Sequence, residues 1–389
     1  MVKVILTQIM KDESHVAKRM LDSVKTIVDG ICIIDTGSTD NSIEIVKQWG
    51  IDNNIETYVF ERPFDDFENS RNYSFEKARE VFLSKRDGHT YYNFWLDFDE
   101  VLQIEPTFNK QNIDKEFYMF NTFIGEMKYT RNEMARLDKP YVWYGPVHEY
   151  ILPIEGALSG LMEGLSVKVF MDGGSWKTNT AEKYRKHAAI YDAYLNNKNR
   201  DPRWIFYAGQ SYADSANVPD NRPENEERMR RSIKYFRERL TLGGYEEERF
   251  YSQWRIASLM AVLEEPWAKV LQEFLKAHAM DPLRAEPLKS IVDYYMMNGE
   301  WNLAYLYSSF ARKMYHAKNP YPTRLLFVNE NLYNWEILNG HIATCLNTGR
   351  KDEAAANYRE LLDLTKTHPN YFNPETLQRI NGYRSTFGM

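Results

Sequence analysis

The amino-acid sequence predicts two domains, an α/β domain built on a parallel sheet and an all-α domain that follows it. The first hundred residues alternate between short apolar runs and amphipathic stretches, the pattern of β-α-β units. Beyond Thr180 the apolar spacing is helical almost throughout. With 389 residues the chain is also too long for one ordinary domain. We therefore expect an α/β domain over residues 1–178 and a helical domain over residues 179–389.

Four strands and three helices are expected in the first hundred residues. The strands are expected at residues 2–9, 31–34, 55–60 and 91–96, and the helices at residues 14–29, 43–50 and 69–83. Gly30 and Gly50 are expected to stop the first two helices. Continuous apolar strands indicate a sheet covered on both faces. Asp35 and Asp97 each follow a strand, so both carboxylates are expected at the crevice beyond the strand ends.

The rest of the chain changes in character twice. Residues 105–175 are expected to form short strands and loops, including the aromatic segment 141–149. In the helical half, the Gly turns at 298–300 and 348–350 are each followed by a similar spacing of small and aromatic residues. This spacing is similar to that of tetratricopeptide repeats. An all-α domain without true repeats explains the same pattern equally well.

Composition narrows the class of protein. Apolar residues make up 43% of the chain and aromatic residues 14%, which is enough for a large core. A net charge of -6 argues against a broad nucleic-acid surface. The two cysteines, Cys32 and Cys345, are too far apart to suggest a disulfide framework or a zinc spacing. The N-terminus does not look like a secretory signal, and no apolar run is long enough for a membrane span. The expectation is a soluble, cytoplasmic protein.

The acidic segment Asp97-Phe98-Asp99-Glu100 is the strongest candidate for chemistry. A nucleoside diphosphate needs a hard divalent cation, and carboxylate oxygens are the ligands that such cations prefer. An acidic turn at a strand end is the simpler alternative. Asp35 could accept a hydrogen bond from a base or ribose, whereas Asp40 is more simply a helix cap. Arg71 opens the third helix, where it could balance a phosphate or form a surface salt bridge.

Four segments in order carry a family resemblance. Residues 9–13, 35–40, 70–72 and 95–100 resemble the motifs of family-2 glycosyltransferases of the GT-A fold, over roughly residues 1–175. The most similar branch carries a tryptophan-glycine-valine-histidine-glutamate type of segment, and helical repeats follow in many members. Residues 143–149 and the helical half match this plan. The resemblance implies a Rossmann-like nucleotide-diphospho-sugar transferase domain followed by a tetratricopeptide-like domain.

The resemblance also implies roles for particular residues. The implied donor-binding residues are Asp12, Asp35, Arg71 and Asp97. The implied ligands of Mn²⁺ or Mg²⁺ are Asp99 and Asp97, with Asp172 as a substitute for a histidine that relatives often place near the metal. Glu149, or else His148, would lie near the acceptor hydroxyl. Thr36 departs from the pattern, because many relatives have a second aspartate there.

The predicted function is transfer of a sugar from a nucleotide-diphosphate sugar to a hydroxyl of a glycan or another acceptor. The expected mechanism is a metal-dependent single displacement with inversion, in which Glu149 removes the proton of the hydroxyl. One alternative is a helical-repeat binding scaffold with a degenerate transferase domain. Another is a sugar nucleotidyltransferase, which would need a Gly-rich phosphate loop that residues 7–13 do not provide. Self-association through the helical half is a further hypothesis.

Overall fold

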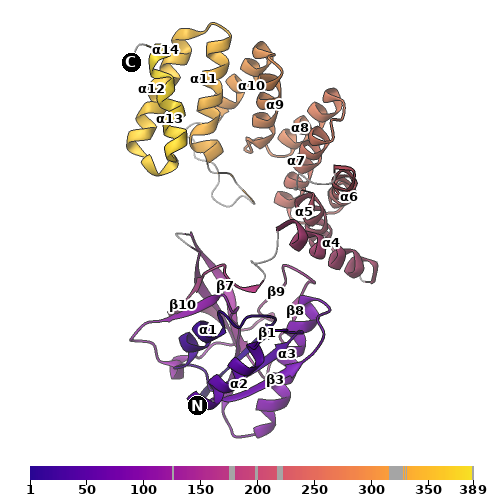
Figure 1. The fold of residues 1–389 in the computed structure, drawn as a ribbon, viewed down its shortest axis with the longest axis vertical. Coiled ribbons are helices and arrows are strands. Elements are labelled where there is room, and N and C mark those ends of the chain that lie inside the picture. The colour runs from indigo at the N-terminus through magenta and orange to yellow at the C-terminus, as the bar shows by residue number, and fades with distance from the viewer. Residues whose placement is uncertain are drawn as a thin grey trace. The chain divides into compact units, whose positions relative to one another are not determined.

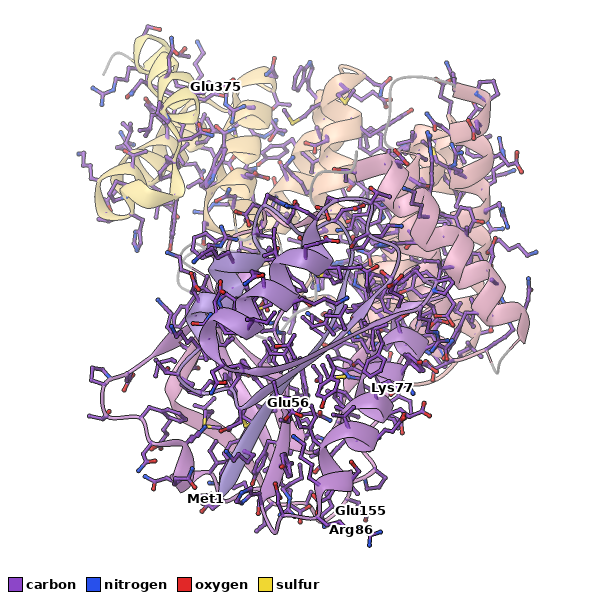
Figure 2. The ribbon with its side chains drawn as sticks, turned by 60° about the horizontal axis from the view of Figure 1, so that its bottom comes forward. Met1, Glu56, Lys77, Arg86, Glu155 and Glu375 are labelled. Atoms are coloured by element: carbon purple, nitrogen blue, oxygen red, sulfur yellow. The ribbon has the colours of Figure 1, made fainter. Side chains whose placement is uncertain are left out.

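The computed structural model describes residues 1–124, 127–174, 180–197, 200–216, 222–314, 327, 329 and 331–387. The chain forms two compact units, Met1–Asn199 and Arg200–Met389 (Figure 1). The first unit combines a sheet with helices and the second is helical, which confirms the predicted fold class of an α/β domain followed by an all-α domain. Charged side chains such as Glu56, Arg86 and Glu155 are exposed on the first unit (Figure 2).

An eight-stranded mixed sheet forms the centre of the first unit, in the order β3-β2-β1-β4-β7-β6-β10-β5. Its strands are β1 (Val2–Met10), β2 (Gly30–Asp35), β3 (Glu56–Glu61), β4 (Thr90–Phe94), β5 (Glu100–Ile104), β6 (Phe117–Ile124), β7 (Met127–Arg136) and β10 (Ser159–Val169). Two short strands, β8 (Trp143–Tyr144) and β9 (Tyr150–Ile151), form a separate pair. The strands β1 to β4 are parallel, as predicted, and β7 runs antiparallel to β4. The chain leaves β1 toward β2 and returns on its other side as β4, so the strand order switches there.

The segment from 105 to 175 differs from the prediction of short strands and loops. It supplies β6, β7 and β10, three long strands of the same sheet. The strand β7 was not predicted because it is polar: Arg131 and Glu133 interrupt the apolar alternation that is typical of a strand. These two side chains form an ion pair inside the protein, where Glu133 is fully buried. The positive charge of Arg131 opposes the effect of burial, which still raises the pKa of Glu133 to about 8.

Helices cover both faces of the parallel strands, as predicted. The helices of the first unit are α1 (Ala17–Val24), α2 (Ser42–Asn53), α3 (Phe67–Phe82) and α4 (Thr180–Asn197), with short 3-10 turns at Leu83–Lys85 and Lys110–Asn112. Val4 and Leu6 of β1 pack in one core cluster with the side chains of α1 and α2. Their neighbour Ile5 packs instead with Phe82 of α3. Because successive strand residues point to opposite faces, α3 covers the face that α1 and α2 leave open.

Two glycines that were predicted to stop helices have a different role. Gly30 is the first residue of β2, and Gly50 lies inside α2, which continues to Asn53. A Cβ atom on Gly50 would lie 2.1 Å from Oγ1 of Thr57, and one on Gly30 would lie 2.5 Å from the ring of Phe82. Both positions need glycine because a neighbouring element packs directly on the backbone. The helix α2 ends instead at Asn54, in the left-handed conformation.

The second unit is a series of helical hairpins. Its helices are α5 (Pro202–Ser215), α6 (Arg222–Thr241), α7 (Glu246–Val262), α8 (Trp267–Met280), α9 (Glu286–Met297), α10 (Trp301–Met314), α11 (Ile337–Asn347), α12 (Lys351–Thr367), α13 (Pro374–Gly382) and α14 (Arg384–Phe387), with a π-helical turn at Leu332–Glu336 and a 3-10 turn at Pro369–Tyr371. From α5 to α12 each helix packs on the next. Gly299 and Gly349 lie in the predicted turns with φ of 73° and 76°. No helix of the described residues is both long and apolar enough to cross a membrane.

Candidate functional site

Three of the sequence-predicted residues reach the same edge of the sheet. Asp35 ends β2 opposite Met10 of β1, and Asp97 follows β4 on the other side of β1. Arg71 lies near the start of α3 and contacts Asp97. These side chains therefore gather beyond the carboxyl ends of parallel strands, at the point where the strand order switches. Open parallel sheets commonly bind their ligands at such a point.

Arg71 connects three side chains through one guanidinium group. Its Nε donates to Oε1 of Glu149 at 2.6 Å, its Nη1 to Oε1 of Gln8 at 2.8 Å, and its Nη2 to Oδ1 of Asp97 at 3.0 Å. The guanidinium also lies over the ring of Trp143, 4.8 Å from the centroid. Only 8% of Arg71 is exposed, so it is not a surface salt bridge. The rigid planar group fixes the carboxylates of Asp97 and Glu149 relative to each other.

The carboxylate of Asp97 is ionised and reaches solvent. Burial alone would raise its pKa, but the positive charges of Arg71 and Arg131 outweigh burial and lower it. Gln8 donates a further hydrogen bond of 2.5 Å to Oδ1. The side chain is nevertheless 43% exposed. Asp97 thus presents a fixed negative charge at the edge of the sheet.

Glu100 supports the turn that carries Asp97. It is 1% exposed and accepts hydrogen bonds from the backbone N–H of Asp97 at 2.9 Å and from Arg131 at 2.6 Å. Burial raises the pKa of Glu100, and the charge of Arg131 opposes this rise. Its position inside the protein gives it a structural role, distinct from that of the exposed Asp97.

Asp35 has one carboxylate oxygen without a partner. Its Oδ2 accepts hydrogen bonds of 3.0 Å from the backbone N–H groups of Gly37 and Ser38. Its Oδ1 is buried and has no hydrogen-bond partner in the structure. The residue is only 2% exposed. A buried acceptor without a partner is costly, and its presence indicates that a ligand group can donate to it.

Asp12 and Thr36 hold the loop that follows β2. Oδ1 of Asp12 accepts hydrogen bonds from the backbone N–H and the hydroxyl of Thr39, at 2.6 and 3.1 Å. The hydroxyl of Thr36 donates to the carbonyl of Met10 at 3.0 Å. The loop is thereby tied to the end of β1. The carboxylate of Asp12, expected to bind the donor, has its Oδ1 engaged within the protein.

Asp99 lies beside Glu13, for which the sequence analysis gave no role. Both flank a pair of glycines after β10. A Cβ atom on Gly173 would lie 3.1 Å from Cβ of Asp99 and 3.5 Å from Oε2 of Glu13, while the N–H of Gly174 donates to both oxygens of Glu13 at 3.1 Å. Burial, helped by the negative charges of Asp99 and Asp97, raises the pKa of Glu13 to about 7. Its place directly after the first strand is the signal that could have identified it.

The carboxylates of Asp97, Asp99 and Glu13 suit a hard divalent cation chemically. All three offer oxygen ligands, and a cation would relieve the repulsion that Glu13 experiences. They do not form a compact ligand set here. Among the residues that the structure describes, the one group of three His, Cys, Asp or Glu side chains with ligand atoms within 4.8 Å of one another is in the second unit.

Asp172 is bound to a neighbouring arginine. Its two carboxylate oxygens accept hydrogen bonds of 2.6 and 2.7 Å from Arg19, and this bonding lowers the pKa of Asp172. To coordinate a metal, Asp172 would have to give up this pair. His15 lies beside it and hydrogen-bonds its backbone carbonyl at 2.8 Å. A histidine therefore does reach this segment, from the N-terminal part of the chain. Ser175, which follows the two glycines of the same segment, lies outside the described residues.

Glu149 and His148 face different neighbours. Glu149 is bound to Arg71, and its side chain is 13% exposed. His148 is exposed and its ring meets that of His187 of α4 edge to face, with 6.0 Å between the centroids. The charge of Asp99 also acts on Lys183 of α4, an electrostatic interaction that sequence reasoning missed. Burial lowers the pKa of His187 to about 3, so its ring is neutral.

Comparisons with known proteins give two kinds of relative. No family model matches the chain. The glycosyltransferase SunS of Bacillus subtilis strain 168, derived from the SPbeta prophage, and that of Bacillus phage SPbeta are each 24% identical over 216 residues, which is 52% of this chain and 47% of theirs. Among solved structures, MamA matches 52% of this chain and all of its own with 14% identity and a TM-score of 0.36. Staphylococcus aureus TarS matches 66% of this chain and 53% of its own with 10% identity and a TM-score of 0.34.

The matches to these proteins are partial. The two structural likenesses have TM-scores too low to bear on function. The chain spans about half the length of the curated relatives that it matches. Both of these relatives are named as glycosyltransferases, the class that the sequence motifs of the first unit predict.

Proposed function

We propose that this chain is a metal-dependent glycosyltransferase that moves a sugar from a nucleoside-diphosphate sugar to an acceptor hydroxyl, with inversion at the anomeric carbon. The observation that carries the proposal is the group of side chains around Arg71 at the strand switch point. It presents an ionised Asp97 and a fixed Glu149 at the edge of the sheet where the partnerless oxygen of Asp35 also lies. The curated relatives support the same class.

The donor is proposed to bind across the carboxyl ends of β2, β1 and β4. Oδ1 of Asp35 accepts a hydrogen bond from the base or the ribose. Asp99 is the first choice of metal ligand, with Asp97 and Glu13 beside it. Mn²⁺ or Mg²⁺ bound there supplies positive charge to the diphosphate as it leaves. The charge of Asp99 also acts on Lys183 of α4.

Glu149 is proposed as the base. Arg71 holds its Oε1, and among the described residues none hydrogen-bonds to its Oε2. That oxygen takes the proton of the acceptor hydroxyl as the hydroxyl oxygen attacks the anomeric carbon. Arg71 keeps its bonds to Gln8 and Asp97 when Glu149 becomes neutral, so its charge stays compensated. Replacement of Glu149 by Gln should leave donor binding intact and lower kcat by about 10²–10⁴-fold. Unchanged turnover would exclude this role.

A thermal-shift screen tests the class and the donor together. The full chain is melted with UDP-, GDP- and dTDP-linked sugars, each with Mn²⁺ and with a chelator. We expect one nucleotide class to raise the midpoint of unfolding in the presence of Mn²⁺, because a ligand that binds only the folded state stabilises it. Asp35→Asn should abolish the shift, since the amide places a donor or a weaker acceptor at Oδ1. Absence of a shift with every nucleotide would favour a scaffold with a degenerate transferase domain.

A further inference from the structure

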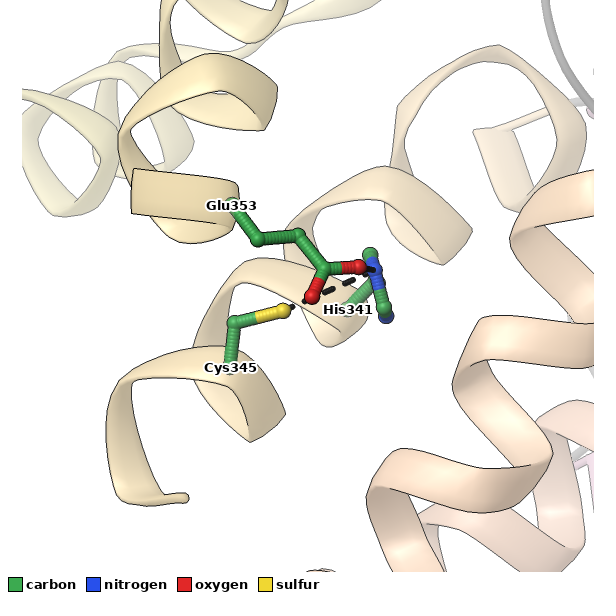
Figure 3. Close-up of side chains that lie close together, drawn as sticks. All are labelled: His341, Cys345 and Glu353. Carbon is green, nitrogen blue, oxygen red and sulfur yellow. Dashed lines mark hydrogen bonds and ion pairs between the residues drawn. The ribbon is translucent and has the colours of Figure 1, made fainter. Parts of the chain in front are cut away.

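A cluster of metal-ligand side chains lies in the helical unit, between α11 and α12 (Figure 3). His341 and Cys345 are four residues apart on α11, so they share one face of that helix. Glu353 lies in the first turn of α12. Nε2 of His341 is 3.0 Å from Oε1 of Glu353 and 3.5 Å from Sγ of Cys345. All three ligand atoms lie within 4.8 Å of one another.

We propose that His341, Cys345 and Glu353 form a zinc site that joins α11 to α12. Zn–N and Zn–O bonds of about 2.0–2.1 Å and a Zn–S bond of about 2.3 Å set tetrahedral edges of about 3.6 Å for N···S and about 3.3 Å for N···O. The His341–Cys345 separation already matches the first edge, and the His341–Glu353 separation is close to the second. Two of the three ligand-to-ligand edges of the cluster therefore already fit a zinc ion.

The residues around the cluster orient its ligands. Oγ of Ser308 lies 3.0 Å from Nδ1 of His341 and 3.1 Å from the carbonyl of Tyr305. The hydroxyl of Tyr305 donates to the second carboxylate oxygen of Glu353 at 2.9 Å. Partners of this kind, on the far side of each ligand, are typical of metal sites.

Binding requires a defined movement of protons. The Cys345 thiol releases one proton, so that the thiolate and the Glu353 carboxylate neutralise the two charges of the ion. The tautomer of the imidazole changes, so that its proton lies on Nδ1 instead of Nε2 and forms a hydrogen bond to Oγ of Ser308. The hydroxyl of Ser308 can then donate its own proton to the carbonyl of Tyr305. Every polar group of the cluster thus has a partner both without zinc and with zinc bound.

The ligand types and their exposure select zinc. A thiolate with an imidazole suits zinc better than Mg²⁺ or Mn²⁺, which prefer oxygen ligands. Cys345 is fully buried and His341 is 2% exposed, whereas the side chain of Glu353 is 40% exposed. Glu353 therefore gives the ion a path from solvent and leaves a fourth position for water.

Cobalt(II) spectroscopy of the full, chelator-treated and reduced chain tests the site. Co²⁺ should give a thiolate-to-cobalt charge-transfer band that saturates at one equivalent and is displaced by Zn²⁺. Cys345→Ala should remove the band, and Cys32→Ala, at the other buried cysteine, should retain it. Asp99→Asn should also retain it, since carboxylates give no such band. The result is therefore independent of the glycosyltransferase proposal.

A second variant guards against loss of the fold. Glu353→Gln, at a partly exposed side chain, should weaken Zn²⁺ binding at least about tenfold, because even outer partners contribute roughly 10–100-fold. At a zinc concentration that fills the site of the wild-type chain and leaves that of this variant mostly empty, zinc should slow hydrogen exchange in α11 and α12 of the wild type and much less in the variant. Absence of the thiolate band in the wild-type chain, or its survival in Cys345→Ala, would overturn the proposal. The three side chains would then be only a hydrogen-bonded core cluster.

Discussion

Arg71 makes three charge-assisted or polar hydrogen bonds from one buried guanidinium, and each bond fixes a different side chain. A lysine at the same place would keep the positive charge, but its three N–H groups share one nitrogen on a flexible chain and could not reach acceptors that lie around a planar guanidinium. The geometry of the first unit's site therefore depends on the shape of this group as well as on its charge.

Arg71→Lys is expected to destabilise the first unit by about 1–3 kcal/mol, the usual cost of leaving a buried polar group without its hydrogen-bond partner. Urea unfolding followed by tryptophan fluorescence would measure the change. Arg19→Lys is the matched control, because Arg19 also holds a carboxylate with two hydrogen bonds but lies 34% exposed. Its cost should be within about 1 kcal/mol. Equal effects of the two variants would contradict the role given to Arg71.

The raised pKa of Glu13 predicts that the stability of the first unit depends on pH. The folded protein holds the pKa of its carboxyl at about 7, above the ordinary 4.5. The fold therefore binds this proton more tightly than the unfolded chain does, and that stabilisation is lost as the pH rises from about 4.5 to 7. Glu13→Gln stays neutral, so without divalent metal it should be more stable than wild type at pH 8, by on the order of 2 kcal/mol. The gain should vanish toward pH 4.5.

Denaturant unfolding at a series of pH values measures this difference. Asp172→Asn serves as the control, because Arg19 lowers the pKa of that carboxyl and the substitution should bring no gain at pH 8. A gain from Glu13→Gln that is the same at pH 5 and pH 8 would show that its cause is packing rather than charge.

At the scale of elements, the strands β1 to β4 and the helices between them could be predicted, because their apolar runs are long and end sharply. The ends of those runs also placed Asp35 and Asp97 at one sheet edge. The partners of Arg71 could not be found in this way, since Gln8 and Glu149 come from distant parts of the chain. The role of Glu149 was predicted from a family resemblance and from its place at the end of the aromatic segment 141–149, and its contact with Arg71 was not predicted. The helix-stop reading of Gly50 failed because local sequence does not reveal which element packs on a glycine.

Gly50→Ala tests that packing. The new methyl group would lie 2.1 Å from Oγ1 and 2.7 Å from Cβ of Thr57, so α2 and β3 would have to separate. We expect a loss of about 1–3 kcal/mol, typical of an overpacked core. Hydrogen exchange read by mass spectrometry reports the two units separately and would locate the change in the first.

The helical unit supplies the control. Gly340 lies inside α11 with nothing within 4 Å of an added Cβ atom. Gly340→Ala should therefore stabilise that unit by roughly 0.5–1 kcal/mol, the helix preference of alanine over glycine. If Gly50→Ala were as harmless as Gly340→Ala, the contact between α2 and β3 described here would be wrong.

At the scale of the whole molecule, the order of the two units follows from the sequence, because strand and helix periodicities occupy separate halves of the chain. The remaining strands of the sheet could not be predicted in this way. In β7, for example, the charged residues Arg131 and Glu133 pair with each other and interrupt the apolar pattern of a strand. The proposed zinc cluster could not be predicted from the sequence either, because a search for paired cysteines overlooks one histidine, one cysteine and one glutamate on two helices. Each unit is thus proposed to hold its own metal, with oxygen ligands in the first and a thiolate in the second.

Donor cleavage by the first unit is tested most directly by measuring the release of nucleoside diphosphate from UDP-, GDP- and dTDP-linked sugars by the full chain. We predict release from one class of donor with Mn²⁺, its loss with a chelator, and a fall of at least about 10²-fold in Asp99→Asn, because metal stabilisation of the leaving group is worth several kcal/mol. Asp172→Asn should retain release. Failure of every donor to release its nucleotide, or equal release by Asp99→Asn and wild type, would contradict the account.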